Sequence, residues 1–395
     1  MRAKIALTFL LTLLCGIGNA QTAPRVFSID GKALAERKQK KDASLTAAIA
    51  KLDANARKVL KSEVASIITK QATPPSGSKN DYMSQAPYFW RNPETKDGLP
   101  YIRKDGERNP EIQRYPDHKL MDDMMDAVED LSRAYYFTDK EEYAAKATDV
   151  LRMWFLNAKT RMNPNLEFAQ AIPGLNTGRG IGIIETRGLT RVVESVGLLA
   201  GAKAWTKDDQ AGLEKWFGDY LRWLTDSKNG RDEGNAKNNH GTFYDVQAIS
   251  FALFARKDDV AKKLLESAKQ NRIAKQIEPN GSQPLELERT QSWGYSTMNL
   301  EGFVSLAELG DAAGVDLWNY ETKGGRSIRK AFDFLYPFAT GEKKWTHKQI
   351  DPLKPERLYT LMRRANGKFR DKRFNEMMSA VPKLKTDDPE MLFHF

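Results

Sequence analysis

Cysteine is almost absent from this chain, which has a single cysteine, Cys15, among 395 residues. A framework of disulfide bonds is therefore excluded, and a chain of this length can form a stable core without disulfides or structural metals. Hydrophobic residues make up 41% and charged residues 29% of the sequence. This balance is ordinary for a globular protein and excludes a disordered chain or a collagen-like repeat.

Long apolar runs are also scarce. The one at the N-terminus, residues 5–17, is too short to span a bilayer comfortably. It follows Arg2 and Lys4 and leads to small residues that end at Ala20, which is the pattern of a secretory signal peptide. We therefore expect residues 1–20 to be a cleaved signal peptide, and the mature protein to be periplasmic or secreted.

Alternating strand patterns are scarce as well, whereas helical patterns recur along the chain. Apolar side chains repeat every three or four residues from Leu120 to Tyr135, and Thr206 with Asp209 forms a predicted capping box. The predicted helices cover residues 45–70, 120–135, 143–155, 186–204, 206–224, 243–255, 258–270, 297–309 and 327–339. We expect a single all-α domain over residues 21–395, in which roughly ten helices, many in antiparallel pairs, close into an (α/α) toroid with one concave face.

Four long polar segments separate these helices. They cover residues 74–117, 160–185, 227–242 and 277–294. Segments of this length in a compact domain are often functional, and their content of Trp, Tyr, Asn, Arg and Gly argues against disorder. The binding cleft is predicted where they converge.

Histidine occurs only four times in the chain. There is no HExxH motif and no pair of histidines at ligand spacing, so neither a metal site nor a cofactor is predicted. Structural roles are expected for His118, His347 and His394. His240 differs, because it lies in the polar run 235–242 with three asparagines and a glycine, a composition that suits a polar site better than a core.

Basic residues outnumber acidic ones, 62 to 52, which gives a formal net charge of +10. No nucleic-acid-binding motif accompanies this excess. In an exported protein the charge is explained either by solubility alone or by an acidic extracellular partner such as a polyanionic glycan. No membrane span and no nucleic-acid partner are predicted.

Four blocks of aromatic, amide and basic residues stand out between residues 75 and 310. They are Tyr82–Trp90 followed by Gly98–Tyr101 and Asp105-Gly106; Trp154-Phe155 with Thr160–Leu166 and Ala169–Gly174; Asn238–Gly241; and Arg289-Thr290 with Tyr295. In this order and spacing they resemble the alginate lyase superfamily. The resemblance implies an incomplete (α/α) toroid that cleaves uronate polysaccharides by β-elimination. It also implies that Tyr295, His240, Asn239 and Arg289 are the catalytic residues.

The chemistry of β-elimination explains these residue types. The C5 proton of a uronate is weakly acidic while the adjacent carboxylate is charged, so Asn239, His240 and Arg289 are predicted to neutralise that carboxylate. Tyr295 is the family's proton acceptor, and Arg289 is expected to lower its pKa.

The geometry of the sugar decides which side chain takes the proton. In a syn elimination, as with β-mannuronate or β-glucuronate, Tyr295 would take the C5 proton and return it to the leaving oxygen. With α-guluronate the proton and the leaving group lie on opposite faces, and His240 would be the base and Tyr295 the acid. Neither scheme requires a metal.

Aromatic and basic side chains in the long segments are expected to hold the substrate. They are Tyr88, Trp90, Tyr244 and Trp293 for the faces of the sugars, and Arg179, Lys237, Arg187 and Arg114 for flanking carboxylates.

Three functions remain open at this point. The first is a lyase that acts on alginate, with glucuronan as the alternative substrate. The second is a glycoside hydrolase on a similar toroid, which needs two opposed carboxyl groups, drawn from Glu286, Glu288, Asp232 and Asp245. The third is a non-catalytic uronate-binding protein, for which a proton acceptor has no use.

One geometric condition applies to the lyase. Arg289 and Tyr295 are six residues apart, which places them on different faces of a continuous helix. They converge only if Gly294 or Pro284 shapes a non-helical turn between them.

Overall fold

The computed structural model describes residues 23–40 and 42–393. The predicted signal peptide, residues 1–20, and His394 lie outside the described residues. Most of the described chain is helical and strands are few and short, which confirms the expected all-α class. Within the described part of the chain, no helix is both long and apolar enough to cross a bilayer.

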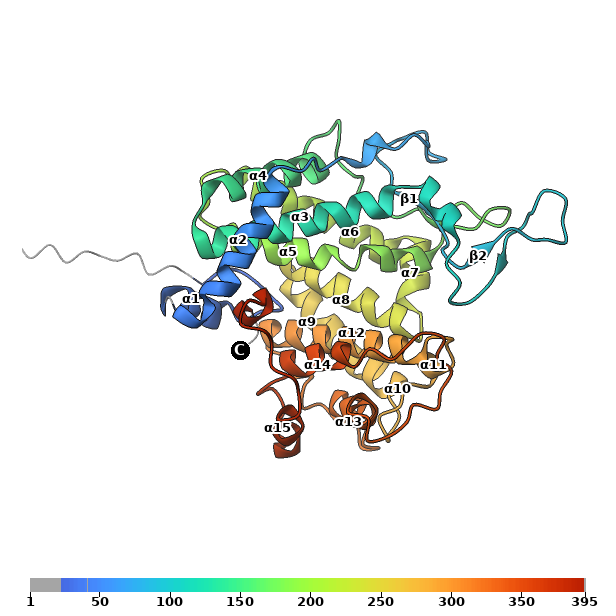
Figure 1. Ribbon diagram of the computed structural model, residues 1–395. Coiled ribbons are helices and arrows are strands. Elements are labelled where there is room, and N and C mark those ends of the chain that lie inside the picture. The colour runs from blue at the N-terminus through green and yellow to red at the C-terminus, as the bar shows by residue number, and fades with distance from the viewer. Residues whose placement is uncertain (1–22, 41, 394–395) are drawn as a thin grey trace, which may run out of the picture.

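The longer helices form two layers. The inner helices contact one another in chain order and are stacked from top to bottom in Figure 1. They are α3 Asp117–Thr138, α5 Leu189–Leu198, α8 Asn239–Phe254, α12 Ser292–Ala313 and α14 Pro355–Arg364. Outside them lie α2 Thr46–Leu60, α4 Glu141–Leu151, α6 Lys207–Asp226, α9 Asp258–Ala268 and α13 Ile328–Ala339. The arrangement is the expected incomplete (α/α) toroid.

The shorter helices lie between these layers or at their ends. They are α1 Gly31–Lys40, α7 Lys228–Gly234, α10 Ala274–Gln276, α11 Pro284–Leu287 and α15 Lys372–Met378. Two π-helical turns, Arg152–Leu156 and Lys269–Ile273, extend α4 and α9.

Local sequence signals account for several helix ends and faces. At the start of α6 the predicted capping box is present, because Thr206 Oγ1 accepts from Asp209 N and the Asp209 carboxylate accepts from Thr206 N. Helix α8 is buried on all sides from Gly241 to Phe254. A helix with protein on every side has no polar stripe, which explains why α8 shows no amphipathic period in the sequence.

Two small sheets hold the long N-terminal segments together. Strand β1 Met83–Gln85 pairs in parallel with β4 Phe168–Ala171, and β2 Phe89–Trp90 pairs antiparallel with β3 Ile102–Arg103. The β2–β3 hairpin and the chain beyond it project from the toroid at the end where α7 and α11 lie (Figure 1).

Two of the expected loops contain helices instead. Segment 227–242 holds α7, whose first turn is capped by Ser227 Oγ accepting from Gly230 N, and α8 already begins at Asn239. Segment 277–294 holds α11, which starts at Pro284, and the first turn of α12. Asn239 and His240 therefore lie on the first turn of a helix rather than in a loop. A capping serine and an N-terminal proline favour such short helices. The aromatic and amide residues around them are equally typical of loops, so the sequence did not predict these two helices.

Candidate active site

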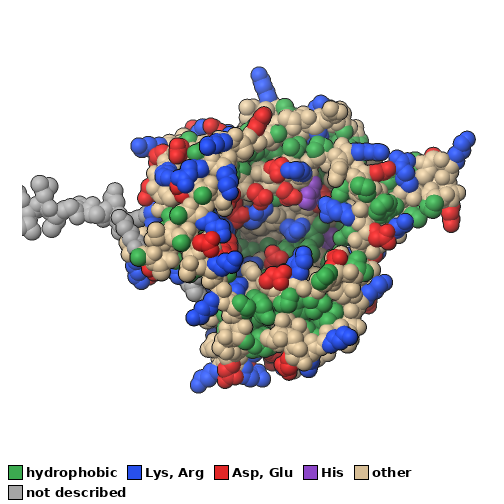
Figure 2. All heavy atoms as spheres, viewed as in Figure 1, with side chains coloured by type: hydrophobic (Ala, Val, Ile, Leu, Met, Phe, Trp, Pro, Cys, Tyr) green, Lys and Arg blue, Asp and Glu red, His purple; other side chains and the backbone are tan. Residues whose placement is uncertain are grey.

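A cleft of about 510 Å³ lies at the end of the toroid that carries the hairpin and the N-terminal turns of α8 and α12. Figure 2 shows that this face of the molecule is hollowed at its centre, with acidic and basic side chains around the hollow and histidine side chains at one side. The cleft is lined by Pro87, Tyr88, Phe89, Arg103, Arg108, His118, Gln170, Arg179, Ile181, Ile184, Glu185, Arg187, Ala236, Asn238, Asn239, His240, Arg289, Tyr295 and Met298. All four long segments supply polar side chains to it, and segment 227–242 supplies Asn238, Asn239 and His240.

Arg289, Tyr295 and Tyr88 are joined by hydrogen bonds in this cleft. Arg289 Nη2 donates to Tyr295 Oη at 2.8 Å, and the hydroxyls of Tyr88 and Tyr295 are 3.1 Å apart. The guanidinium carbon of Arg289 also lies 3.7 Å from the centre of the Tyr295 ring. The required break in the helix exists, but it falls over residues 288–291 between α11 and α12, whereas Gly294 lies within α12.

Asp105 holds the other side of Arg289. Arg289 Nη2 donates to Asp105 Oδ1 at 2.9 Å, and Arg289 Nε donates to Oδ2 at 3.3 Å. Burial alone would raise the pKa of Asp105, but the Arg289 guanidinium lowers it to about 2. The adjacent Gly106 has φ of 80°, and a Cβ there would lie 2.6 Å from Thr290 Oγ1. Only glycine therefore allows the hairpin to bring Asp105 this close to Arg289.

Tyr295 is held as a neutral phenol in the free protein. Burial raises its pKa above the ordinary value, the hydrogen bond with Tyr88 raises it further, and Arg289 only partly opposes these effects. Arg289 does lower the pKa of Tyr295, as expected, but desolvation of the phenolate outweighs this one neighbouring cation, so the net pKa is raised. Tyr295 is consequently a proton donor at neutral pH.

His240 is held by a carboxylate behind the cleft wall. Its Nδ1 lies 2.7 Å from Glu233 Oε1, and the two side chains are 17% and 1% exposed. His240 thus presents only part of its ring to the cleft.

Asn239 borders the cleft but is fully buried. Its backbone N–H and its Nδ2 both donate to the carboxylate of Glu286, each at 2.7 Å, and its Oδ1 has no hydrogen-bond partner. Burial raises the pKa of Glu286, while the two hydrogen bonds from Asn239 oppose the shift. One hydrogen of the Asn239 amide is therefore committed to Glu286.

The remaining wall of the cleft is rich in cations. Arg179 donates to both the backbone and side-chain oxygens of Gln170 and stacks over Phe89 at 5.1 Å. A role as a structural histidine was expected for His118, but it lines the cleft, where its hydrogen bond to Asp122 raises its pKa. The side chains of Arg103, Arg108 and Arg187 complete this wall.

Two residues expected to stack on sugars are buried. Trp293 is 1% exposed, packs edge-to-face against Trp345, and donates from Nε1 to a backbone carbonyl. Tyr244 is 8% exposed and its hydroxyl donates to Leu224 O. Both sit on the helices α12 and α8, whose inner faces pack into the core, so neither ring can meet a sugar.

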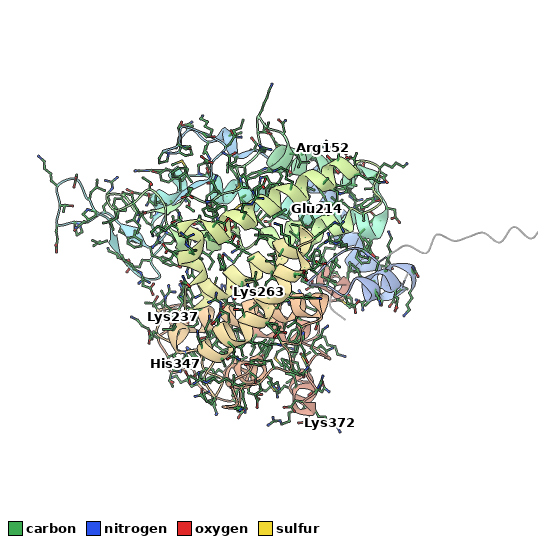
Figure 3. All side chains as sticks on the ribbon, turned by 180° about the vertical axis from the view of Figure 1, so that it is seen from behind. Arg152, Glu214, Lys237, Lys263, His347 and Lys372 are labelled. Atoms are coloured by element: carbon green, nitrogen blue, oxygen red, sulfur yellow. The ribbon has the colours of Figure 1, made fainter. Side chains whose placement is uncertain are left out.

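Other predicted binding residues lie beside the cleft rather than in it. Trp90 follows the cleft residues Tyr88 and Phe89 but does not line the cleft; its Nε1 donates to Glu107 O. Lys237 is exposed, between two residues that line the cleft, and Figure 3 shows it at the same end of the molecule as His347. Arg114 is 63% exposed and pairs with Glu111.

Three of the four carboxylates proposed for a hydrolase are held in other contacts. Glu286 is committed to Asn239, and Asp245 is buried in an ion pair with Arg272 at 2.8 Å. Asp232 is 53% exposed and pairs with Lys228. The geometry therefore does not support the hypothesis of a glycoside hydrolase.

Three acidic residues of the site were not anticipated in these roles. Asp105 stands in a recognisable block of the sequence, but nothing local indicates that it pairs with Arg289. Glu233 lies seven residues before His240, and Glu286 lies far downstream of Asn239. Only the folded chain places Glu233 against His240 and Glu286 against Asn239. Among the described residues, no cluster of three or more His, Cys, Asp or Glu side chains is arranged to hold a metal ion.

Comparisons with known proteins identify the family of this chain. The family model for alginate lyases matches residues 66–345. A crystal structure of an alginate lyase from Bacteroides ovatus is 37% identical, with a TM-score of 0.89 over 94% of this chain and 99% of that one. A histidine-to-alanine variant of alginate lyase A1-III, complexed with a tetrasaccharide, is 18% identical with a TM-score of 0.58 over 95% of this chain and 98% of that one. No curated protein sequence matches significantly.

The fold and the family match define a polysaccharide lyase built on a helical toroid. More particularly, the chain belongs to the alginate lyase family.

Proposed function

We propose that this lyase cleaves alginate by β-elimination in the cleft described above and leaves 4,5-unsaturated uronate ends. The observation that carries the proposal is the cluster of Arg289, Tyr295 and Tyr88 in the same cleft as His240. A proton donor, a cation and an imidazole are the groups that the reaction uses. The relatives that match over nearly the whole chain, which are named alginate lyases, support alginate as the substrate.

The reaction moves one proton and one pair of electrons. A base takes the C5 proton, the C5–H electrons form the C4–C5 double bond, and the C4–O bond breaks with its electrons on the leaving oxygen. That oxygen then takes a proton. Negative charge grows on the uronate carboxylate as C5 loses its proton, so donors aimed at this carboxylate lower the barrier.

Arg289 is the cation that stabilises the negative charge on the uronate carboxylate. Its Nε and Nη2 are used by Asp105 and Tyr295, while Nη1 has no hydrogen-bond partner among the described residues. Its Nη1 hydrogens are therefore free to bind a uronate oxygen. The cations Arg103, Arg108 and Arg187 lie in the same wall and attract the carboxylates of neighbouring sugars.

Tyr295 donates its proton to the leaving oxygen in this proposal, because it is a neutral phenol in the free protein. With α-guluronate, His240 takes the C5 proton from the opposite face. With β-mannuronate the proton and the leaving group share a face, and Tyr295 must first lose its own proton to act as the base. Activity on polymannuronate should then rise with pH more steeply than activity on polyguluronate.

The test is the growth of near-ultraviolet absorbance from unsaturated uronate ends. Wild-type protein is compared with Tyr295→Phe on polymannuronate, polyguluronate and glucuronan. We expect absorbance with wild type on at least one alginate block and a loss of about 10²–10⁴-fold in Tyr295→Phe. Tyr359→Phe is the matched control, because this tyrosine of α14 donates to a backbone carbonyl, Ala339 O, away from the cleft. Activity on glucuronan alone, or no absorbance on any polymer, would overturn the proposal.

We also propose that the protein is exported and loses residues 1–20. The basic start, the short apolar run and the small residues before position 21 support this. The mass of the protein recovered from the periplasm or medium tests it, since cleavage after Ala20 gives a chain that begins at Gln21, whereas an intact Met1 would contradict it.

A further inference from the structure

Glu233 is a buried carboxylate with one specific contact. It lies near the end of α7, and its Oε1 is 2.7 Å from His240 Nδ1. Its other oxygen, Oε2, is buried without a hydrogen-bond partner. Close packing fixes the helix that carries it, because a Cβ on Gly180 would lie 2.5 Å from Asn229 O and 3.1 Å from Glu233 N. The carboxylate therefore has little freedom to move away from the imidazole.

This contact decides which ring nitrogen of His240 carries hydrogen. A carboxylate only accepts hydrogen bonds, so an Oε1 at 2.7 Å requires a hydrogen on Nδ1. The second ring nitrogen, Nε2, has no hydrogen-bond partner among the described residues, and the His240 side chain is one of those that line the cleft. In the neutral ring Nε2 then carries the lone pair that can accept a proton.

We propose that Glu233 is a positioning residue for His240. It holds the ring in one orientation, keeps Nδ1 protonated, and stabilises the imidazolium that forms when Nε2 takes the C5 proton of the substrate. The effect on turnover rests on the proposed function, whereas the effect on the tautomer does not. Other charges act on the pair as well, since Arg179 interacts with Glu233 and Glu286 interacts with His240. Neither of these residues makes a hydrogen bond with the imidazole.

The tautomer can be measured directly. The chain has only four histidines, so protein labelled with ¹⁵N-histidine gives few signals, and the spectrum of His240→Gln identifies those of His240. In wild type we expect the Nδ1 of His240 to be protonated throughout the pH range in which the protein is folded. In Glu233→Ala this hydrogen-bond acceptor is removed, and the neutral ring should shift to the Nε2–H form that free imidazole side chains favour. Glu233→Gln keeps the shape and removes the charge, which covers the case in which the alanine variant does not fold.

Kinetics provide the second readout. Glu233→Ala should lower kcat by about 100-fold while KM stays near the wild-type value, because Glu233 forms no hydrogen bond or ion pair with the cations of the cleft wall. The loss should be larger on polyguluronate than on polymannuronate, since His240 is the base only for the former. Asp232→Ala is the matched control: it is the neighbouring acid on α7, 53% exposed and paired with Lys228 at the surface. It should change neither the His240 signals nor the rate.

Two results would overturn the inference. One is a wild-type tautomer of His240 in both Glu233→Ala and Glu233→Gln. The other is a kcat in these variants close to that of Asp232→Ala. Absence of product with the wild-type protein would instead refute the proposed function and would leave the NMR result to decide the role of Glu233.

Discussion

A buried ion pair anchors the segment that leads to the cleft. Lys70 Nζ lies 2.5 Å from Asp117 Oδ2, and neither side chain is exposed. Lys70 also donates to Asp81 O, and Asp117 Oδ2 accepts from Met83 N at 2.9 Å. The pair thus joins the start of α3 to Asp81 and to Met83, the first residue of β1, which lies five residues before Tyr88.

Replacing Lys70 by Met should destabilise the protein strongly. The change leaves Asp117 buried without a cation, and the loss of one partner of a buried pair costs about 3–5 kcal/mol. Burial already raises the pKa of Asp117, against the attraction of Lys70, so the variant should bind a proton at this carboxyl. An unfolding entropy of roughly 2 cal/mol/K per residue converts the cost into a fall of about 4–6 °C in the melting temperature.

The assay is thermal unfolding at a fixed scan rate, together with kcat on the preferred polymer. The double variant Lys70→Met/Asp117→Leu removes both charges and should recover most of the lost stability. Lys119→Met is the surface control on the same helix, because its pair with Asp123 is 78% and 50% exposed and an exposed pair adds little to stability. A melting temperature of Lys70→Met equal to that of Lys119→Met would refute the reasoning.

Three further predictions concern a buried tyrosine, the carboxyl group of Glu194 and the hairpin. Tyr244→Phe should cost about 1 kcal/mol in urea unfolding and leave KM unchanged, because its hydroxyl bonds a backbone carbonyl rather than substrate; a raised KM would contradict this. Burial raises the pKa of Glu194 from 4.5 to about 7, so stability should fall by about 3 kcal/mol as pH rises through this range. Melting temperatures at pH 5 and pH 8 should show this fall in wild type and a smaller one in Glu194→Gln; equal falls would contradict the assignment. Gly106→Ala would place a Cβ 2.6 Å from Thr290 Oγ1 and should lower kcat by displacing the hairpin from Arg289; a wild-type rate would show that the hairpin can adjust.

Much of the fold was predictable because helices depend on local patterns. The apolar repeat over Leu120–Tyr135 and the capping residues Thr206 and Asp209 act within one or two turns of chain, and both produced the expected helices. The resemblance in ordered blocks added the family and the toroid. The short helices α7 and α11 were missed, because the aromatic and amide residues around them are equally typical of loops.

The candidate site was predictable by residue type and less so by geometry. Tyr295, Arg289, His240 and Asn239 do meet in one cleft, and their catalytic roles stay predictions. Trp293 was expected at the surface, yet it is buried. An aromatic residue at the edge of a polar run gives no local indication of which side of its helix faces the core.

By itself, the sequence determined the helical class, the family and the types of the reactive side chains. Only the tertiary structure decided their environments. Asp105, Glu233 and Glu286 reach their partners across the fold, and burial rather than the neighbouring cation sets the pKa of Tyr295. The physical reason is that helix formation is governed by neighbours in the chain, whereas desolvation, ion pairing and tautomer choice depend on groups that become neighbours only when the toroid closes.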